Sequence, residues 1–196
     1  MTQVFTPTVY KQLSLMVLVE LIFKISEYVL AIVLRGNPKS TLTTLVINKI
    51  YLLDMIFTLS EYFIEVFLVP ELKQVWWMMH LGISMVITGE IIRKTAIITA
   101  GYGFTHQIRT NRDEEHQLVT HGIYKYMRHP GYVGYMIWSV GVQIMLCNPL
   151  WAIGLAVELW RFFSDRIVYE EKYLREFFGE RYDEYARRVP SGVPFV

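Results

Sequence analysis

The stretch LSLMVLVELIFKISEYVLAIVL, residues 13–34, decides the class of fold, because it is apolar over the length of a membrane-crossing helix. Such a helix needs about 20 mostly apolar residues. Two more long apolar blocks follow, at about 45–69 and 75–99. Charged residues make up 19% of the chain and hydrophobic residues 53%, whereas soluble domains carry about 25% charged residues. The sequence therefore predicts an all-α, polytopic integral membrane protein.

Two shorter apolar blocks, VGYMIWSVGVQIMLC (133–147) and LWAIGLAVELWRFF (150–163), flank Asn148 and Pro149. Asn followed by Pro is a turn signal. Each block is short for a complete span, so the pair forms either two thin spans or a re-entrant helical hairpin. In both cases the chain returns to the side that it left, which predicts about five membrane segments.

Ionisable residues inside the long apolar blocks are expected to face other helices. Glu20 and Lys24 are four residues apart and can pair on one helix face. Asp54, Glu61 and Glu65 fall within a narrow stripe of one face. Because a charge that faces lipid is costly, this stripe should point into the helix bundle.

Basic residues predict the orientation. The 35–44 loop has two basic residues and no acid, the 100–131 segment has four basic residues, and residues 164–196 have six. Loops rich in Lys and Arg stay in the cytosol. All three segments lie on one side if the first three blocks cross the membrane, so that side is predicted to be cytosolic. An amphipathic cytosolic region is expected from about residue 164.

The length of 196 residues fits one domain, 1–196, with membrane helices in 1–99 and the polar, chemistry-capable residues in 100–196. The net charge of +1 argues against a nucleic-acid binder, which usually carries a basic face. His106 and His116 stand ten residues apart without an HxxxH or HExxH pattern, so no metal site is predicted.

The densest polar constellation is THGIYKYMRHPGYVGY, residues 120–135. Its glycines permit close backbone approach, its tyrosines supply aromatic faces, and Arg128 and His129 add a fixed cation and a titratable group. An interfacial belt of Tyr and Arg is the plainer interpretation. Further along, Arg166 and Glu170 are one helical turn apart. They form either a surface ion pair, worth a few tenths of a kcal/mol, or a functional pair near membrane depth.

These segments resemble one family. The runs LVTHGIYKYMRHPGYVGYMIWSVGVQIMLCNP, WRFFSDRIVYEE and FFGERYDEYARRVPSGVPF are similar to the isoprenylcysteine carboxyl methyltransferases, and so are LKQVWW and GEIIRKTAIITAGYGFTH upstream. The likeness covers roughly residues 20–196, and the short chain is most like the plant members. Arg-His-Pro followed by Tyr also occurs in phospholipid methyltransferases and sterol-reductase-like membrane proteins. The CNP turn, the RVPSGVPF tail and the FTH segment are more particular to the family.

The resemblance implies a multi-pass enzyme of the endoplasmic reticulum membrane whose active site faces the cytosol. Such an enzyme methylates the C-terminal prenylcysteine of processed CaaX proteins, such as small GTPases, with S-adenosylmethionine as methyl donor. It makes 100–196 the cofactor-binding and catalytic region, with Arg166 and Glu170 as catalytic residues and Arg166 toward the substrate carboxylate. The implied cofactor contacts are Arg109, which varies in the family, and His116, Gln117, Leu118, Val119, Tyr124, His129, Pro130, Gly131, Tyr132 and Glu170.

The residues suit such a reaction. A C-terminal carboxyl has a pKa of about 3.3–3.7, so it is ionised at neutral pH and needs no general base. The nearest competing function is that of a membrane phospholipid methyltransferase, whose amine acceptor must first lose a proton. A nicotinamide-dependent reductase and a non-catalytic membrane scaffold are two further possibilities. Binding of S-adenosylmethionine separates the two methyltransferase functions from the reductase and the scaffold, which would not bind it.

Overall fold

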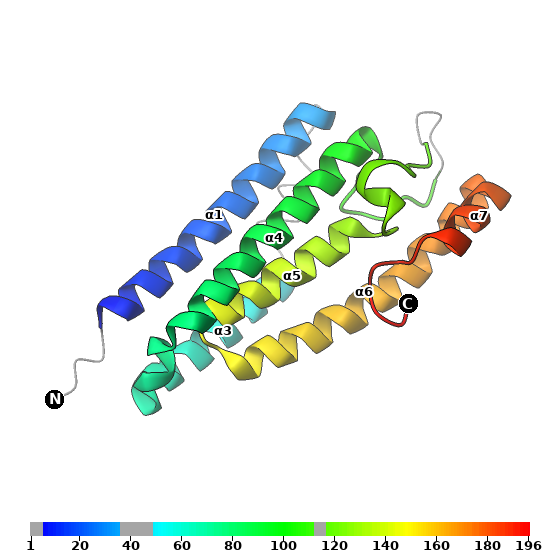
Figure 1. Ribbon diagram of the computed structural model, residues 1–196. Coiled ribbons are helices and arrows are strands. Elements are labelled where there is room, and N and C mark those ends of the chain that lie inside the picture. The colour runs from blue at the N-terminus through cyan, green and yellow to red at the C-terminus, as the bar shows by residue number, and fades with distance from the viewer. Residues whose placement is uncertain (1–5, 36–48, 112–116) are drawn as a thin grey trace.

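The computed structural model describes residues 6–35, 49–111 and 117–196, and the described residues form helices without any strand (Figure 1). The predicted all-α class is therefore confirmed. In chain order the helices are α1 (Pro7–Arg35), α3 (Lys49–Leu68), η1 (Pro70–Gln74), α4 (Trp76–Ala100), η2 (Gly101–Gly103), η3 (Gly122–Lys125), α5 (Pro130–Met145), α6 (Pro149–Phe178) and α7 (Glu180–Arg188).

Helices α4 and α5 lie side by side with their backbones in contact, and glycines make this possible (Figure 1). A Cβ atom on Gly82 would lie 2.2 Å from the backbone nitrogen of Met145, and one on Gly89 would lie 2.5 Å from that of Trp138. On α5, a Cβ atom on Gly134 would lie 2.7 Å from the backbone nitrogen of Arg93, and one on Gly141 would lie 2.9 Å from that of Val86. The two glycines of each helix are about two turns apart and so share one face. Small residues of this kind let helices pack closely where water supplies little driving force.

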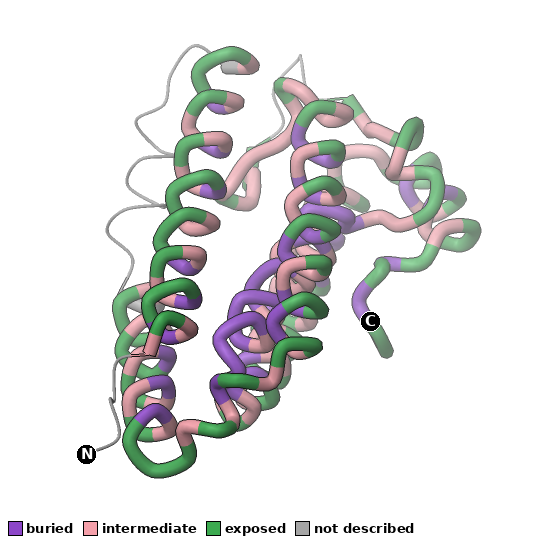
Figure 2. The backbone as a smooth tube through the Cα atoms, turned by 60° about the vertical axis from the view of Figure 1, so that its left-hand side comes forward, coloured by how far each residue is buried: buried purple, intermediate pink, exposed green. Residues whose placement is uncertain are grey.

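Buried residues are concentrated along the facing sides of the helices, and the outer sides of α1 and α3 are exposed (Figure 2). The core includes Phe23 of α1, Tyr62 of α3 and Trp138 of α5. The outer sides nevertheless carry large apolar side chains, such as Leu21 and Phe67. An apolar surface of this extent is typical of contact with lipid or with a partner.

None of the helices in the described part of the chain combines the length and the apolar character that a membrane crossing requires. The number of membrane segments stays a prediction.

The acidic stripe of α3 faces the protein, as predicted. The Trp151 indole N–H donates to Asp54 at 2.7 Å. The carboxylate of Glu61 accepts from the backbone N–H groups of Leu150 at 2.8 Å and Trp151 at 2.6 Å. These are among the first N–H groups of α6, which have no partner within the helix. Glu61 therefore caps α6, and α3 fixes the point at which α6 begins.

Lys73 holds the turn between α5 and α6 from the other side. Its side chain is 2% exposed and pairs with Glu65 at 2.6 Å. It also donates to the carbonyls of Leu146 and Cys147, both at 3.0 Å, and to Asn148 Oδ1 at 2.9 Å. A cation at the C-terminal end of a helix satisfies its last carbonyls. The turn predicted at Asn148 is thus confirmed, and buried polar contacts stabilise it.

Helix α6 continues well beyond the apolar block that ends at residue 163. The polar residues from 164 onward extend the same helix to Phe178, which makes it about 45 Å long. Between residue 163 and Gly179 the sequence has no Gly or Pro, and Gly179, with a φ of +55°, ends the helix. The C-terminal region therefore does not begin as a separate element at residue 164.

The C-terminal tail returns to the start of α5. The backbone N–H groups of Arg128 and His129 donate to the carbonyls of Pro190 and Ser191, each at 2.9 Å. The Trp160 indole donates to the Pro194 carbonyl at 2.9 Å. The tail therefore ties the segment before α5 to α6, which brings two distant parts of the sequence together.

We expect Gly89→Ala to lower the free energy of unfolding by about 1–3 kcal/mol, because the added methyl group meets the α5 backbone. This corresponds to a melting temperature lower by about 3–10 °C in detergent. Gly154→Ala on α6 is the matched control, since its Cβ meets only the Trp151 ring, at 3.2 Å. Equal melting temperatures for the two variants would contradict the close packing of α4 and α5.

Candidate functional site

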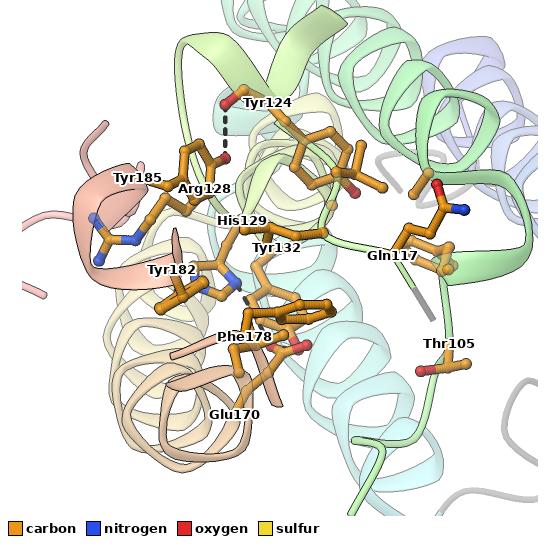
Figure 3. Close-up of a pocket in the computed structure, with 17 residues that line it drawn as sticks. Thr105, Gln117, Tyr124, Arg128, His129, Tyr132, Glu170, Phe178, Tyr182 and Tyr185 are labelled. Carbon is orange, nitrogen blue, oxygen red and sulfur yellow. Dashed lines mark hydrogen bonds and ion pairs between the residues drawn. The ribbon is translucent and has the colours of Figure 1, made fainter. Parts of the chain in front are cut away.

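A pocket opens between the segment after α4, the start of α5, the end of α6 and α7 (Figure 3). It holds about 760 Å³ of empty space, part of it open to solvent, which is within the usual range for small-molecule sites. Its lining residues are Ala100, Gly103, Phe104, Thr105, Gln117, Leu118, Val119, Tyr124, Arg128, His129, Gly131, Tyr132, Glu170, Leu174, Phe178, Tyr182 and Tyr185.

The hydroxyl of Tyr132 joins the two polar residues of α6 that the spacing singled out. It donates to Glu170 Oε2 at 2.6 Å and accepts from Arg166 Nε at 2.9 Å. Arg166 also donates through Nη2 to the carbonyl of His106 at 2.6 Å. Arg166 and Glu170 therefore share one face of α6, but Tyr132 bridges them instead of a direct ion pair. Among the described residues no acceptor contacts Nη1 of Arg166, which is left for a further acceptor.

His129 stands between two carboxylates of α6. Its Nδ1 lies 3.5 Å from Glu170 Oε2, and its Nε2 lies 3.2 Å from Glu171 Oε1. Glu171 is 5% exposed and also forms ion pairs with Arg128 at 2.6 Å and with Arg175 at 3.0 Å. Arg128 in turn donates to the carbonyl of Val189 next to the tail. Glu171 therefore fixes both side chains of the Arg-His pair that precedes α5.

Charges in this cluster set its protonation. Burial alone would lower the pKa of His129, but hydrogen bonds and charge from Glu170 and Glu171 outweigh it and raise that pKa above its ordinary value. Burial would raise the pKa of Glu170, but His129, Tyr132 and Arg166 together hold it below the ordinary value. The pKa of Glu171 is likewise lowered, to about 2, by His129 and Arg128 against the effect of burial. At neutral pH the site therefore presents Glu170 as a carboxylate.

Aromatic rings form the other walls. Tyr124, Phe178 and Tyr182 surround the space, and the Tyr185 hydroxyl donates to the Tyr124 carbonyl at 2.7 Å (Figure 3). Gln117 brings an amide to the side away from Tyr185 (Figure 3). Aromatic faces attract cations and stack on flat rings. With the Glu170 carboxylate they suit a cationic ligand that carries an aromatic group.

The structure brings most of the predicted cofactor residues to this pocket. Those that line it are Gln117, Leu118, Val119, Tyr124, His129, Gly131, Tyr132 and Glu170. Pro130 is buried as the first residue of α5 and does not line the pocket. Arg109 lines a smaller neighbouring hollow with Tyr173 and Phe177, and its Nη2 donates to the Tyr102 carbonyl at 2.8 Å. His116 lies outside the described residues, and the roles of all these residues stay predictions.

Several lining residues were not predicted as ligand contacts. They are Ala100, Gly103, Phe104, Thr105, Arg128, Leu174, Phe178, Tyr182 and Tyr185. The GYGFTH run pointed to Phe104 only as part of a resembling segment. Tyr182 and Tyr185 stand three residues apart on α7 and are both buried, a spacing that places them on one helix face. That pattern alone does not tell which surface the face covers.

The bridging position of His129 predicts a pH dependence. A group whose pKa is raised by folding adds stability that is complete below its ordinary value, about 6.5, and is lost as the pH rises through the raised value. The melting temperature of the protein should therefore exceed that of His129→Asn by a few degrees at about pH 6. This difference should shrink as the pH rises above about 6.5, through the raised pKa of His129. A difference that does not change with pH would mean that His129 is not charged in the folded protein.

Comparison with known proteins identifies the family of this chain. The profile of the isoprenylcysteine carboxyl methyltransferase (ICMT) family matches residues 80–176. Protein-S-isoprenylcysteine O-methyltransferase B of Arabidopsis thaliana is 56% identical over 196 residues, which are 100% of both chains. Protein-S-isoprenylcysteine O-methyltransferase of Homo sapiens is 43% identical over 178 residues, which are 89% of this chain and 62% of the human protein.

A solved structure has the same fold. The eukaryotic intramembrane Ras methyltransferase ICMT superimposes with a TM-score of 0.92 and 37% sequence identity, over 97% of this chain and 69% of that one. An identity of 56% over 196 residues, together with this superposition, shows a relationship closer than a shared fold. The chain therefore belongs to the isoprenylcysteine carboxyl methyltransferase family.

Proposed function

We propose that this chain transfers the methyl group of S-adenosylmethionine to the C-terminal prenylcysteine carboxylate of processed CaaX proteins. The observation that carries the proposal is the Tyr132 bridge, which holds a carboxylate-binding cation, Arg166, beside an anionic pocket residue, Glu170. The names of the relatives, protein-S-isoprenylcysteine O-methyltransferases, agree with this activity.

The pocket residues fit S-adenosylmethionine. When bound, this cofactor supplies an electrophilic methyl group on a sulfonium. Tyr124, Phe178 and Tyr182 provide faces for the adenine ring and for the cation. Glu170 remains ionised because its pKa is held low. A carboxylate in this position accepts hydrogen bonds from ribose hydroxyls or offsets the positive charge of the cofactor.

Arg166 is suited to hold the substrate carboxylate. Two of its donors are already engaged with the Tyr132 hydroxyl and the His106 carbonyl, so its plane and direction are fixed before any substrate arrives. The remaining Nη1 edge offers N–H donors to a carboxylate oxygen. A single edge orients the carboxylate without binding it as strongly as a full bidentate pair would. This matters because the carboxylate loses part of its charge in the transition state.

No side chain needs to remove a proton in this reaction, since the acceptor is already ionised. The contribution of the protein is therefore to place the acceptor in line with the methyl group. The aromatic rings that line the pocket would limit water around bound reactants, and charge neutralisation between the two reactants is more favourable where water is scarce.

We further propose that the protein is a multi-pass protein of the endoplasmic reticulum membrane with about five membrane segments. The apolar outer sides of α1 and α3 support a lipid environment, and the related solved structure is described as intramembrane. The basic residues at 100–131 and 164–196 favour a site that faces the cytosol. Prenylated small GTPases and similar proteins would then reach the pocket from the membrane surface.

The test of this function is an assay in membranes that contain the expressed chain. Labelled S-adenosylmethionine is supplied with a farnesylated cysteine analogue that has a free carboxylate. We expect base-labile label on the analogue, which identifies a carboxyl methyl ester. Label in phospholipid instead would indicate an amine methyltransferase. Absence of any transfer by folded protein that binds the cofactor would overturn the proposal.

The roles of the bridged residues can be separated by substitution. Arg166→Ala and Glu170→Ala should each lower kcat/KM by at least about 100-fold, because each leaves a charged partner without its contact. Tyr132→Phe should lower it by about 10- to 100-fold, since it removes two hydrogen bonds to charged groups.

The matched controls are Arg161→Ala and Glu176→Gln, which alter exposed residues of the same helix. Each control should keep wild-type kcat/KM, and all five variants should keep the wild-type melting temperature within a few degrees. Near-normal activity of Arg166→Ala or Glu170→Ala would show that the assigned roles are wrong.

A further inference from the structure

A buried ion cluster connects α1 to the site, and Glu27 is its centre. Glu27 is 1% exposed, although it lies in the first apolar block. Its Oε1 accepts from Arg93 Nε at 2.8 Å and from Lys94 at 2.6 Å. Its Oε2 accepts from Arg93 Nη2 at 3.1 Å and contacts His106 Nε2 at 2.9 Å. A buried carboxylate stays ionised only if cations and N–H donors compensate for the loss of water, which is what these partners do.

His106 belongs to the non-helical segment that follows η2. The two preceding residues, Phe104 and Thr105, line the pocket. Its Nε2 contacts Glu27, whereas its buried Nδ1 has no hydrogen-bond partner among the described residues. The ring is therefore held through Nε2. Since Nε2 faces a carboxylate, it carries the proton and donates to Glu27. The ring also packs edge-on against Phe104, with centroids 5.6 Å apart.

The backbone of the same residue holds Arg166. The His106 carbonyl accepts from Arg166 Nη2 at 2.6 Å, and this bond and the one to the Tyr132 hydroxyl are the hydrogen bonds that orient the guanidinium. The side chain of His106 is thus anchored to α1, and its main chain is anchored to α6. A shift of this segment would rotate Arg166 away from the direction in which it meets a carboxylate.

We propose that Glu27 and His106 form a positioning pair for Arg166, so that α1 is part of the active site. The inference rests on the proposed function, because it assigns the pair to the binding of the prenylcysteine carboxylate. Neither residue lines the cofactor pocket. Because the His106 carbonyl binds Arg166, we expect the pair to act on the acceptor rather than on the methyl donor.

This assignment predicts a split between two measurements. Loss of the pair should lower kcat/KM for a farnesylated cysteine analogue by about 10- to 100-fold, because small misplacements of a positioning group have effects of this size. The Kd for S-adenosylmethionine should stay within about twofold of wild type. A merely structural role would lower the amount of folded protein and would weaken both measurements together.

The variants follow from the geometry of the ring. His106→Phe keeps the contact with Phe104 but removes the donor to Glu27, whereas His106→Gln keeps an N–H donor at the end of the side chain. We expect His106→Phe to show the loss and His106→Gln to restore most of the activity. His80→Phe is the matched control, since His80 is exposed on α4 and its ring contacts Trp76 of the same helix.

Glu27→Gln tests the other member of the pair. If the two residues act as one unit, Glu27→Gln combined with His106→Phe should lower kcat/KM no further than the more severe single variant. Folding is checked by size-exclusion elution and melting temperature in detergent. If Glu27→Gln does not fold, the comparison of His106→Phe with His106→Gln still decides.

Two results would overturn the inference. One is wild-type kcat/KM in His106→Phe. The other is a loss of cofactor affinity as large as the loss of kcat/KM. An inactive wild-type protein is a different outcome, since it would contradict the proposed function itself. Activity of the wild type on the analogue is therefore established first.

Discussion

The contact between the backbones of α4 and α5 is the constraint on which the arrangement of the site depends. A Cβ atom on Gly134 would lie 2.7 Å from the backbone nitrogen of Arg93, so the first turn of α5 approaches α4 as closely as peptide groups permit. This places the Gly131 carbonyl 3.0 Å from Arg93 Nη1. It also sets the direction in which His129 and Tyr132 extend toward α6. A larger residue in this contact would move both side chains relative to their partners.

Buried charges act as the second level of organisation. Glu27 and Glu171 each pair with three side chains that carry N–H groups. Lys73 donates to one carboxylate and to three further oxygens. Exposed ion pairs contribute about 0–1 kcal/mol and are easily replaced. In a buried cluster, removal of one member leaves the others unpaired, at a cost of several kcal/mol. Such clusters therefore hold helices in a defined arrangement even where their net contribution to stability is small.

Local patterns in the sequence predicted a large part of this structure, and contacts between distant segments account for the rest. The length of the apolar blocks predicted the helices, and the Asn148-Pro149 pair predicted the turn. Helical spacing correctly placed Asp54, Glu61 and Glu65 on an inward face. The Tyr132 hydroxyl was not predicted as a bridge, because its partners lie 34 and 38 residues away. The attachment of the tail to His129 has no local signal either. Gly82 and Gly89 become meaningful only once the partner helix is known.

The geometry of α6 explains why an enzyme of this kind can work with few catalytic groups. Arg166 and Glu170 are one turn apart on a continuous helix, about 6 Å along its axis. The group proposed for the acceptor and the group proposed for the donor thus stand on one rigid element, and Tyr132 fixes both side chains at once. Since the acceptor is already an anion, relative placement is the main requirement of the reaction. A helix whose beginning is capped by Glu61 and whose last turns are held through Glu171 supplies that placement.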